Sequence, residues 1–263
     1  MKIFDTHAHY DDERYSEDLD EVIKDNYENG VKMIVNASYD LESSRKSKQL
    51  ADIYENVYFA VGIHPEGVRD TINEDLLELE QIIKESIEGR KLVAVGEIGL
   101  DYYYTKENKE IQKEYFVRQL DLAIKYNLPV IIHSRDASED MYHILKDKKY
   151  YNIRLVFHCF QPSEDIGKLV KERKYLVGLG GNITFKRSQH SLEIIKSIPV
   201  EQIMVETDAP YMAPVPVRGT RNESKNIKYV IEKLAEIKEI PTKELEDILY
   251  ENSIKFFDIK ENS

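Results

Sequence analysis

The pair His7 and His9, separated by one residue near the start of the chain, has the residue type and spacing of a metal-ligand pair. It lies at the end of a short apolar run that predicts a strand, and in a strand residues two apart point to the same face. Neutral imidazole is among the commonest ligands of divalent metal ions. The alternative is a polar strand end wetted by solvent, so the choice depends on whether other ligands converge there.

Further residues with metal-ligand chemistry stand at the ends of other apolar runs. They are His64, Glu97, His133, His158 and Asp208. Of the seven histidines, only His143 and His190 lie in stretches with helical patterning. Taken singly, each residue has a plain structural explanation: a hydrogen-bonded core histidine, a salt-bridged carboxylate or an aspartate that caps a turn. Their concentration at the ends of apolar runs favours one shared site.

The ligand set is larger than one tetrahedral ion requires, and it suits two ions that share a bridging carboxylate. Glu97, central among the predicted strands, is the expected bridge. The other expected ligands are His7, His9 and Asp208 for one ion and His133 and His158 for the second. Two such ions can activate a water and clamp the oxygens of a phosphoryl displacement. Asp208 is placed to accept the proton of that water, so Asp208 and Glu97 are the expected catalytic residues.

Cationic side chains that follow several of these runs could contact substrate. They are Arg135 in HSRDA, Lys186 and Arg187 in TFKR, and Arg218 and Arg221 in VRGTRNE. The forked guanidinium of arginine suits phosphate oxygens. The alternative for each is a solvated loop charge or a surface ion pair, and for Arg135 by itself this alternative is favoured. Tyrosines 102–104 could stack on a base or equally serve in packing.

The elements that must position these residues alternate regularly. Short β-branched runs at 2–5, 31–37, 57–63, 92–97, 128–133, 154–158, 175–180 and 202–207 predict strands. Amphipathic stretches at 18–29, 41–54, 74–88, 111–126, 138–146, 163–173 and 188–197 predict helices, and two more helices are expected within 225–257. Eight strands, each followed by a helix, indicate an α/β (β/α)₈ TIM barrel, in which functional groups stand at the carboxyl ends of the strands. An open doubly wound sheet is the alternative, disfavoured because no dinucleotide-type glycine turn is present.

Bulk composition narrows the class of protein. A chain of 263 residues suits a single barrel domain spanning 1–263. Its formal net charge of −12 argues against a protein that grips long stretches of DNA by backbone charge alone. A single cysteine, Cys159, excludes an internal disulfide and fits a reducing compartment. With neither a leader-like apolar segment nor a membrane-length one, we expect a cytoplasmic protein without membrane association.

Seven motifs, in order, resemble the TatD family of metal-dependent deoxyribonucleases within the amidohydrolase superfamily. They are DTHAHYD, VGIHPE, VGEIGLDYYY, VIIHSRDA, FHCF, TFK and ETDAPYMAPVPVRGTRNE. The resemblance implies a (β/α)₈ barrel and a magnesium-dependent exonuclease, with metal ligands at the six positions derived above. It adds His64 and the loop carrying Arg218, Arg221 and Asn222 as substrate-side residues. Gln161–Pro162 and Ser224 depart from the family pattern on substrate-side loops.

Three functions are therefore compared. The first is a deoxyribonuclease acting on single-stranded or frayed DNA ends with two divalent ions, Mg²⁺ or Mn²⁺ in turnover and Zn²⁺ or another transition metal as an alternative. The second is a metal-dependent esterase or amidase, such as an aminoacyl-tRNA deacylase, which the net charge favours. The third is a metal-stabilised binding protein without turnover. No exposed seam indicates an obligate protein partner.

Overall fold

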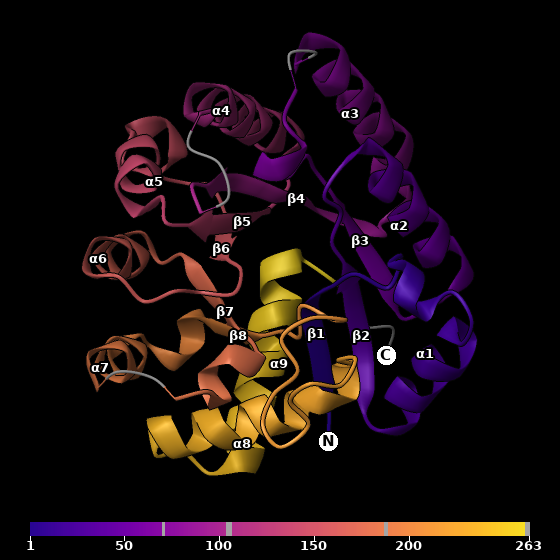
Figure 1. Ribbon diagram of the computed structural model, residues 1–263, viewed down its shortest axis with the longest axis vertical. Helices are drawn as coiled ribbons and strands as arrows, with labels where there is room; N and C mark the ends of the chain where they lie inside the picture. The colour runs from indigo at the N-terminus through magenta and orange to yellow at the C-terminus, as the bar shows by residue number, and fades with distance from the viewer. Residues whose placement is uncertain (70–71, 104–106, 187–188, 261–263) are drawn as a thin grey trace.

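Eight parallel strands follow one another around a barrel in chain order, from β1 to β8 (Figure 1). The computed structural model describes residues 1–69, 72–103, 107–186 and 189–260. The strands are β1 (Ile3–Ala8), β2 (Val31–Asn36), β3 (Val57–Val61), β4 (Leu92–Asp101), β5 (Val130–Arg135), β6 (Leu155–Phe157), β7 (Leu176–Leu179) and β8 (Ile203–Val205). The (β/α)₈ barrel predicted from the alternating pattern is confirmed.

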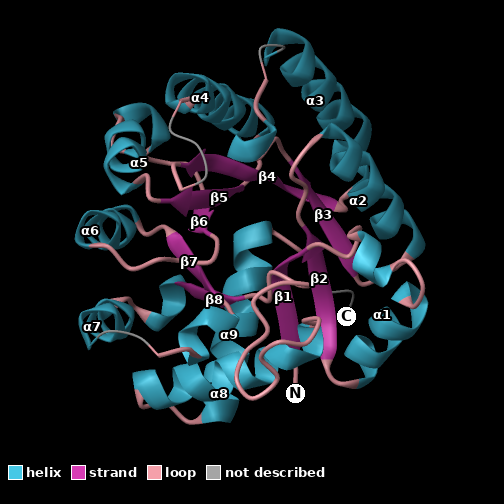
Figure 2. Ribbon diagram, viewed as in Figure 1, coloured by secondary structure: helices cyan, strands magenta, loops and turns pink. Residues whose placement is uncertain are grey.

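The helices cover the outside of the strands (Figure 2). They are α1 (Leu19–Glu28), α2 (Leu41–Ile53), α3 (Ile72–Ser86), α4 (Lys109–Tyr126), α5 (Ser138–Leu145), α6 (Glu164–Arg173), α7 (Gln189–Ser197), α8 (Ile227–Lys238) and α9 (Thr242–Phe257). Local capping starts several of them; Asp40, for example, accepts a hydrogen bond from the Ser43 N–H at the start of α2. None of the helices in the described ranges is both long and apolar enough to span a bilayer.

Several element boundaries differ from the sequence prediction. Strand β4 continues past Glu97 to Asp101, because its backbone keeps pairing with β5 as far as Arg135. Strand β8 ends at Val205, short of the predicted residue 207. The first closing helix begins as a 3₁₀ turn at Ser224–Asn226 and becomes α8 at Ile227. The predicted helix at 188–197 begins at a residue outside the described ranges.

The barrel interior is a packed apolar core closed at one end by α9. Its cluster draws on strands around the barrel and includes Phe4, Val35, Ala60, Ile131 and Met204. Phe256 and Phe257, at the end of α9, belong to the same cluster, and α9 is seen through the ring of strands in Figure 1. Because side chains fill the interior, a functional site has room only at the carboxyl ends of the strands.

Closure of the barrel between β1 and β8 depends on polar contacts as well as on strand pairing. Ala8 bridges Ala209 just beyond β8, and the Thr6 hydroxyl donates to the Val205 carbonyl at 2.9 Å. The buried Asp5 carboxylate accepts hydrogen bonds from the Thr207 hydroxyl and the Ser224 hydroxyl, both at 2.6 Å. These contacts fix the segment after β8 against β1, which brings Asp208 beside His7 and His9.

Asn222 holds that segment together from inside. Its fully buried amide donates to the carbonyls of Thr207 at 3.0 Å and Tyr211 at 2.8 Å. Its carbonyl oxygen accepts from the Glu223 N–H at 3.0 Å and the Asn226 amide at 3.1 Å. An alanine here leaves buried donors and acceptors unsatisfied.

We therefore expect Asn222→Ala to lower the free energy of unfolding by about 2–3 kcal/mol in the absence of any substrate. Chemical denaturation followed by circular dichroism measures this. The matched control is Asn29→Ala, which removes only exposed contacts with Asp25 and should change stability by less than about 0.5 kcal/mol. Equal stability of the two variants would contradict the structural role.

Candidate metal centre

Seven side chains identified from the sequence meet at the carboxyl end of the barrel. They are His7 on β1, His9 just after it, His64 after β3, Glu97 on β4, His133 on β5, His158 after β6 and Asp208 after β8. All but His7, which is fully buried, line a cavity of about 850 Å³ that opens to solvent. The strand order therefore collects at one site residues that are as far apart in the sequence as His7 and Asp208.

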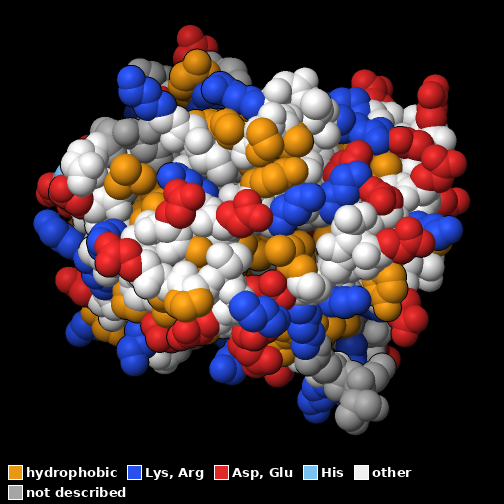
Figure 3. Space-filling model, turned by 90° about the horizontal axis from the view of Figure 1, so that it is seen from below, with side chains coloured by type: hydrophobic (Ala, Val, Ile, Leu, Met, Phe, Trp, Pro, Cys, Tyr) orange, Lys and Arg blue, Asp and Glu red, His pale blue; other side chains and the backbone are white. Residues whose placement is uncertain are grey.

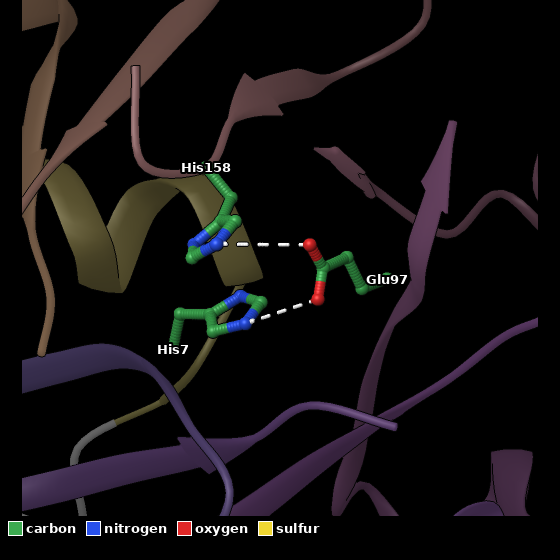
Figure 4. Close-up of side chains that lie close together, drawn as sticks. All are labelled: His7, Glu97 and His158. Atoms are coloured by element: carbon green, nitrogen blue, oxygen red, sulfur yellow. Dashed lines mark ion pairs between the residues drawn. The ribbon is translucent and has the colours of Figure 1, made fainter. Parts of the chain in front are cut away.

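Glu97 lies at the centre of this group. Its Oε2 is 3.4 Å from His7 Nε2, and its Oε1 is 2.7 Å from His133 Nδ1 and 3.6 Å from His158 Nε2. Figure 4 shows the carboxylate pointing between the imidazoles of His7 and His158, with one oxygen toward each. Each oxygen of one buried carboxylate thus faces a different group of nitrogen donors.

On one side of Glu97, His7 and His9 converge with Asp208. The two Nε2 atoms are 3.1 Å apart, and Asp208 Oδ1 lies 3.3 Å from His9 Nε2 and 3.8 Å from His7 Nε2. Donor atoms bound to one ion at about 2.0–2.2 Å stand roughly 3–3.5 Å apart in tetrahedral or octahedral geometry. Asp208 holds this position with a left-handed backbone, φ 58°, a conformation that is unfavourable for a non-glycine residue and clusters at functional sites.

On the other side of Glu97, two carboxylates that sequence reasoning missed orient the histidines. Asp101 Oδ2 lies 2.9 Å from His133 Nε2, and Glu206 Oε1 lies 2.9 Å from His158 Nδ1. Each holds the ring nitrogen that points away from Glu97, which fixes the ring and makes the other nitrogen a better ligand. The only signal in the sequence was their short distance from a predicted ligand: Asp101 stands four residues after Glu97, and Glu206 stands two residues before Asp208.

Glu206 is held tightly between neighbouring segments. Its Oε1 accepts a hydrogen bond from the Cys159 N–H at 2.5 Å. Gly178 on β7 faces it, and a Cβ at that glycine would stand 2.2 Å from the second carboxylate oxygen. Glycine is therefore required where the strand passes this carboxylate, which keeps Glu206 aligned with His158.

The donor set fits divalent metal ions. The nitrogens that face the group are Nε2 of His7, His9 and His158 and Nδ1 of His133, all of which can act as ligands when unprotonated. Three sets of donor atoms, around His7–His9–Asp208, His7–Glu97–His158 and His64–Glu97–His133, each lie within 4.8 Å of one another. Among the described residues, His7 Nδ1 is a buried nitrogen without a hydrogen-bond partner. Because His64 shares one of these donor sets with Glu97 and His133, it belongs with the potential ligands as well as with the substrate side.

The electrostatics of the group keep its carboxylates charged. Burial tends to raise the pKa of Glu97, but the charges of His158 and His7 and the hydrogen bond from His133 outweigh it, so this pKa falls well below the usual range. The pKa of Asp208 is lowered in the same way, because its hydrogen bond to His9 and the charge of His158 overcome burial. Both carboxylates are therefore ionised at neutral pH and available as ligands.

The histidines differ in the direction in which their pKa is shifted. Burial tends to lower every imidazole pKa, but Asp208 raises the pKa of His9 to about 9, and Asp101 with Glu97 raises that of His133 to about 9. The charges of Glu206 and Glu97 raise the pKa of His158 to about 10. In His64 the effect of burial is larger than that of the nearby carboxylates, so its pKa falls to about 3. Without metal, three imidazoles of the group therefore carry a proton at neutral pH.

The other predicted substrate-side residues are less closely grouped. Arg135 lines the cavity, with its guanidinium 3.7 Å from the Tyr103 ring centroid. Arg218 packs over the Phe185 ring at 4.3 Å, and the exposed Lys186 is not among the described residues that line the cavity. Arg187 lies outside the described residues.

Arg221, Asn222 and the tyrosines have their own positions. Arg221 pairs through both terminal nitrogens with Asp18, at 2.8 and 2.6 Å, and Asn222 is buried within the loop. Neither is among the described residues that line the cavity. Of the tyrosines considered for stacking, Tyr102 is buried and donates to Asp140, Tyr103 is exposed, and Tyr104 lies outside the described ranges.

Metal binding is expected to displace protons. In the metal-free protein, the raised pKa values of His9, His133 and His158 give stability that is complete below pH 6.5 and is lost as pH rises toward 9–10. A divalent ion requires the same nitrogens unprotonated. In the presence of chelator, the melting temperature should therefore fall as the pH rises from 6.5 to 9. Over the same range, the increase in melting temperature caused by Mn²⁺ should become larger. Titration calorimetry in buffers of different ionisation enthalpy counts the protons released on metal binding. An increase in melting temperature on adding Mn²⁺ that does not depend on pH would contradict this prediction.

The carboxylates of Asp101 and Glu206, which position His133 and His158, should matter for metal affinity. Each of them contacts the ring nitrogen that points away from Glu97. We expect Glu206→Gln and Asp101→Asn each to weaken Mn²⁺ binding by about 10- to 100-fold, because the ligand rings lose their orientation. Titration calorimetry of the metal-free proteins measures the affinity. Glu66→Gln, another cavity carboxylate, is the matched control and should bind as wild type. Unchanged affinity in both positioning variants would refute their role.

Comparison with known proteins identifies the family and agrees with the fold. A family model described as TatD related DNase matches residues 4–258. YabD of Bacillus subtilis, an uncharacterized metal-dependent hydrolase, is 39% identical over 257 residues, which cover 98% of this chain and 99% of YabD. The crystal structure of YJJV, a TatD homolog from Escherichia coli, has a TM-score of 0.89 at 30% identity and 98% coverage of both chains. An uncharacterized amidohydrolase from Saccharomyces cerevisiae shares the fold, with a TM-score of 0.83 at 19% identity, over 98% of this chain and 100% of that one. The chain therefore belongs to the TatD-related DNase family, a family of metal-dependent hydrolases.

Proposed function

We propose that this protein is a deoxyribonuclease that hydrolyses phosphodiester bonds at single-stranded or frayed DNA ends with two divalent ions. The observation that carries the proposal is the position of Glu97, whose two oxygens face two different groups of donors. A carboxylate in that position can bridge two ions. Mg²⁺ or Mn²⁺ suits turnover, and a donor set this rich in imidazole would also hold Zn²⁺.

Two ions held by this set would supply the charge that stabilises a phosphoryl transition state and lowers the pKa of a water. The protein's own residues do the rest. Glu97, His7 and His158 are buried and set the spacing of the donors. Asp208 keeps one-fifth of its side chain exposed to the cavity and is ionised, so it can accept a proton from an incoming water. Arg135, also at the cavity wall, can pair with a phosphate oxygen.

The charge distribution favours recognition of an end rather than of a long duplex. On the face seen in Figure 3, acidic and basic side chains are interspersed, with apolar side chains between them. Such a surface provides no continuous basic track for a phosphate backbone. On the proposed function, contact with DNA would be concentrated at the cavity, where bound ions would offset the negative charge of the lining.

The charges of the residues that line the cavity favour a second function. Asp40 and Glu66 border the cavity, as does Asp12, which is paired with Arg14. Among the described lining residues, Arg135 is the one arginine and there is no lysine. In a chain with a net charge of −12, such a rim repels polyanions at low salt and accepts neutral substrates more readily. Hydrolysis of a carboxylic ester or amide by the same centre is the alternative that follows.

The decisive experiment is a time course on an end-labelled single-stranded oligonucleotide with Mg²⁺ or Mn²⁺. We expect a ladder that shortens from one end, abolished by chelator and slowed by about a hundredfold or more in Asp208→Asn, which removes the proton acceptor. Asp165→Asn, an exposed aspartate on α6, is the matched control and should cut as wild type.

The other functions predict different results in parallel assays. Intact DNA together with hydrolysis of p-nitrophenyl acetate or an aminoacyl ester by the metal-loaded protein would replace the nuclease by the esterase. Intact substrates of every class, with a melting temperature that still falls on chelation, would indicate a metal-stabilised binding protein.

A further inference from the structure

Two tyrosines at the mouth of the cavity keep much of their surface exposed. Tyr39 is 43% exposed and Tyr211 is 47% exposed, and both line the cavity. Tyr39 follows β2 and Tyr211 follows β8, the strands on either side of β1, which leads to His9. Their ring centroids lie 6.2 and 6.4 Å from the imidazole centroid of His9. The two rings therefore flank the metal centre.

The ring of Tyr211 is fixed in place before any ligand arrives. The Arg14 guanidinium covers it at 4.3 Å from the centroid, and Asp12 holds that guanidinium through two hydrogen bonds of 2.9 Å. The Tyr211 hydroxyl also donates to Asp12 at 3.3 Å. Tyr211 lines the cavity, whereas Arg14 is not among the described lining residues. A flat, preorganised surface is thus presented to the cavity at low entropic cost.

The position of Tyr39 is set by its backbone. Its N–H donates to the Ser43 hydroxyl at 2.9 Å, within the cap that starts α2, and its carbonyl accepts the His64 N–H at 2.8 Å. These contacts tie the residue to the ends of β2 and β3. Its backbone is therefore held at the rim, and 43% of the residue stays open to solvent.

Charge decides which part of a substrate these rings can contact. Asp40 stands beside Tyr39 at the cavity rim and repels a phosphate that is not at the metal centre. The charge of Asp12, beside Tyr211, is balanced by its pairing with Arg14. A nucleobase is neutral and flat, and stacking of a base on an aromatic side chain contributes about 1–3 kcal/mol with little dependence on sequence. The rim is thus suited to a base while the attached phosphate lies at the metal centre.

We propose that Tyr39 and Tyr211 form a binding site for the unpaired base of the nucleotide being removed, and that they set the enzyme's requirement for a single-stranded end. The ligand class rests on the proposed function, since the base is attached to the phosphate held at the metal centre. A terminal base within a duplex is paired with its partner and stacked on the next base pair, so it must break both contacts before it can lie against these rings.

The first test is binding, measured by calorimetry with the Mg²⁺-loaded full-length protein. Deoxyadenosine monophosphate should bind roughly tenfold more tightly than deoxyribose 5-phosphate, because only the former carries a base. Tyr211→Ala and Tyr39→Ala should each reduce that preference several-fold, and Tyr211→Phe should retain it. Equal binding of the two ligands by the wild-type protein would overturn the proposal.

Tyr151→Ala is the matched control. Tyr151 is also 47% exposed and also carries a guanidinium, that of Arg173, over its ring at 3.1 Å, but it is not among the described residues that line the cavity. This variant should keep the preference for the nucleotide. A loss equal to that of Tyr211→Ala would mean that the effect is not local, and would also overturn the proposal.

A second test separates this site from the proposed function. Single-stranded oligonucleotides with normal or abasic nucleotides at both ends are compared, and the abasic ends should raise KM by about tenfold in the wild type and by much less in Tyr211→Ala. Cleavage with equal KM would refute the base site and leave the nuclease. Failure to cleave either oligonucleotide, with the tyrosine-dependent preference for the nucleotide intact, would refute the nuclease and support the base site.

Discussion

The burial of the Glu97 carboxylate is the constraint around which this end of the barrel is built. A charged carboxylate taken out of water costs several kcal/mol unless positive or donor groups surround it. Here the surrounding groups are imidazoles contributed by β1, β5 and β6, together with His64 beyond β3. Only the closed barrel brings these four segments to one point, so the fold and the charge of Glu97 depend on each other.

Each imidazole near Glu97 needs a second partner to hold its ring. His133 has Asp101, His158 has Glu206, and the Nδ1 of His9 lies 2.9 Å from the Ala37 carbonyl. These partners direct the remaining ring nitrogen toward the shared carboxylates. The result is a cluster with more negative charge than its neutral histidines can balance, which protons balance in the metal-free protein and divalent ions would balance in the loaded one.

The segment between β8 and α8 links the centre to the cavity mouth. It carries Asp208 at one end and Tyr211 three residues later, and its polar interior joins it to β1 through Asp5 and Ser224. Arg221, which the sequence suggested for phosphate binding, instead pairs with Asp18 at the edge of this segment. The same short stretch therefore supplies a potential ligand, an aromatic wall and the contacts that keep both in place.

The sequence by itself determined the fold class and the main residues of the candidate metal centre. The alternation of β-branched runs and amphipathic stretches requires parallel strands covered by helices, and any polar residue at a strand end must reach the same rim. His7, His9, Glu97 and Asp208 could therefore be placed together without coordinates.

Tertiary structure alone decided which neighbours each side chain meets. Asp101 gains its role from the ring orientation of His133 on the adjacent strand β5, and Glu206 from that of His158, which follows β6, two strands away. Spacing in the chain does not encode these contacts. Asn222 is buried and hydrogen-bonded because the loop folds over its amide. Tyr39 and Tyr211 lie on either side of His9 because β1 closes the barrel between β2 and β8. Periodicity specifies the face on which a residue lies, whereas contacts across the barrel depend on how its strands close.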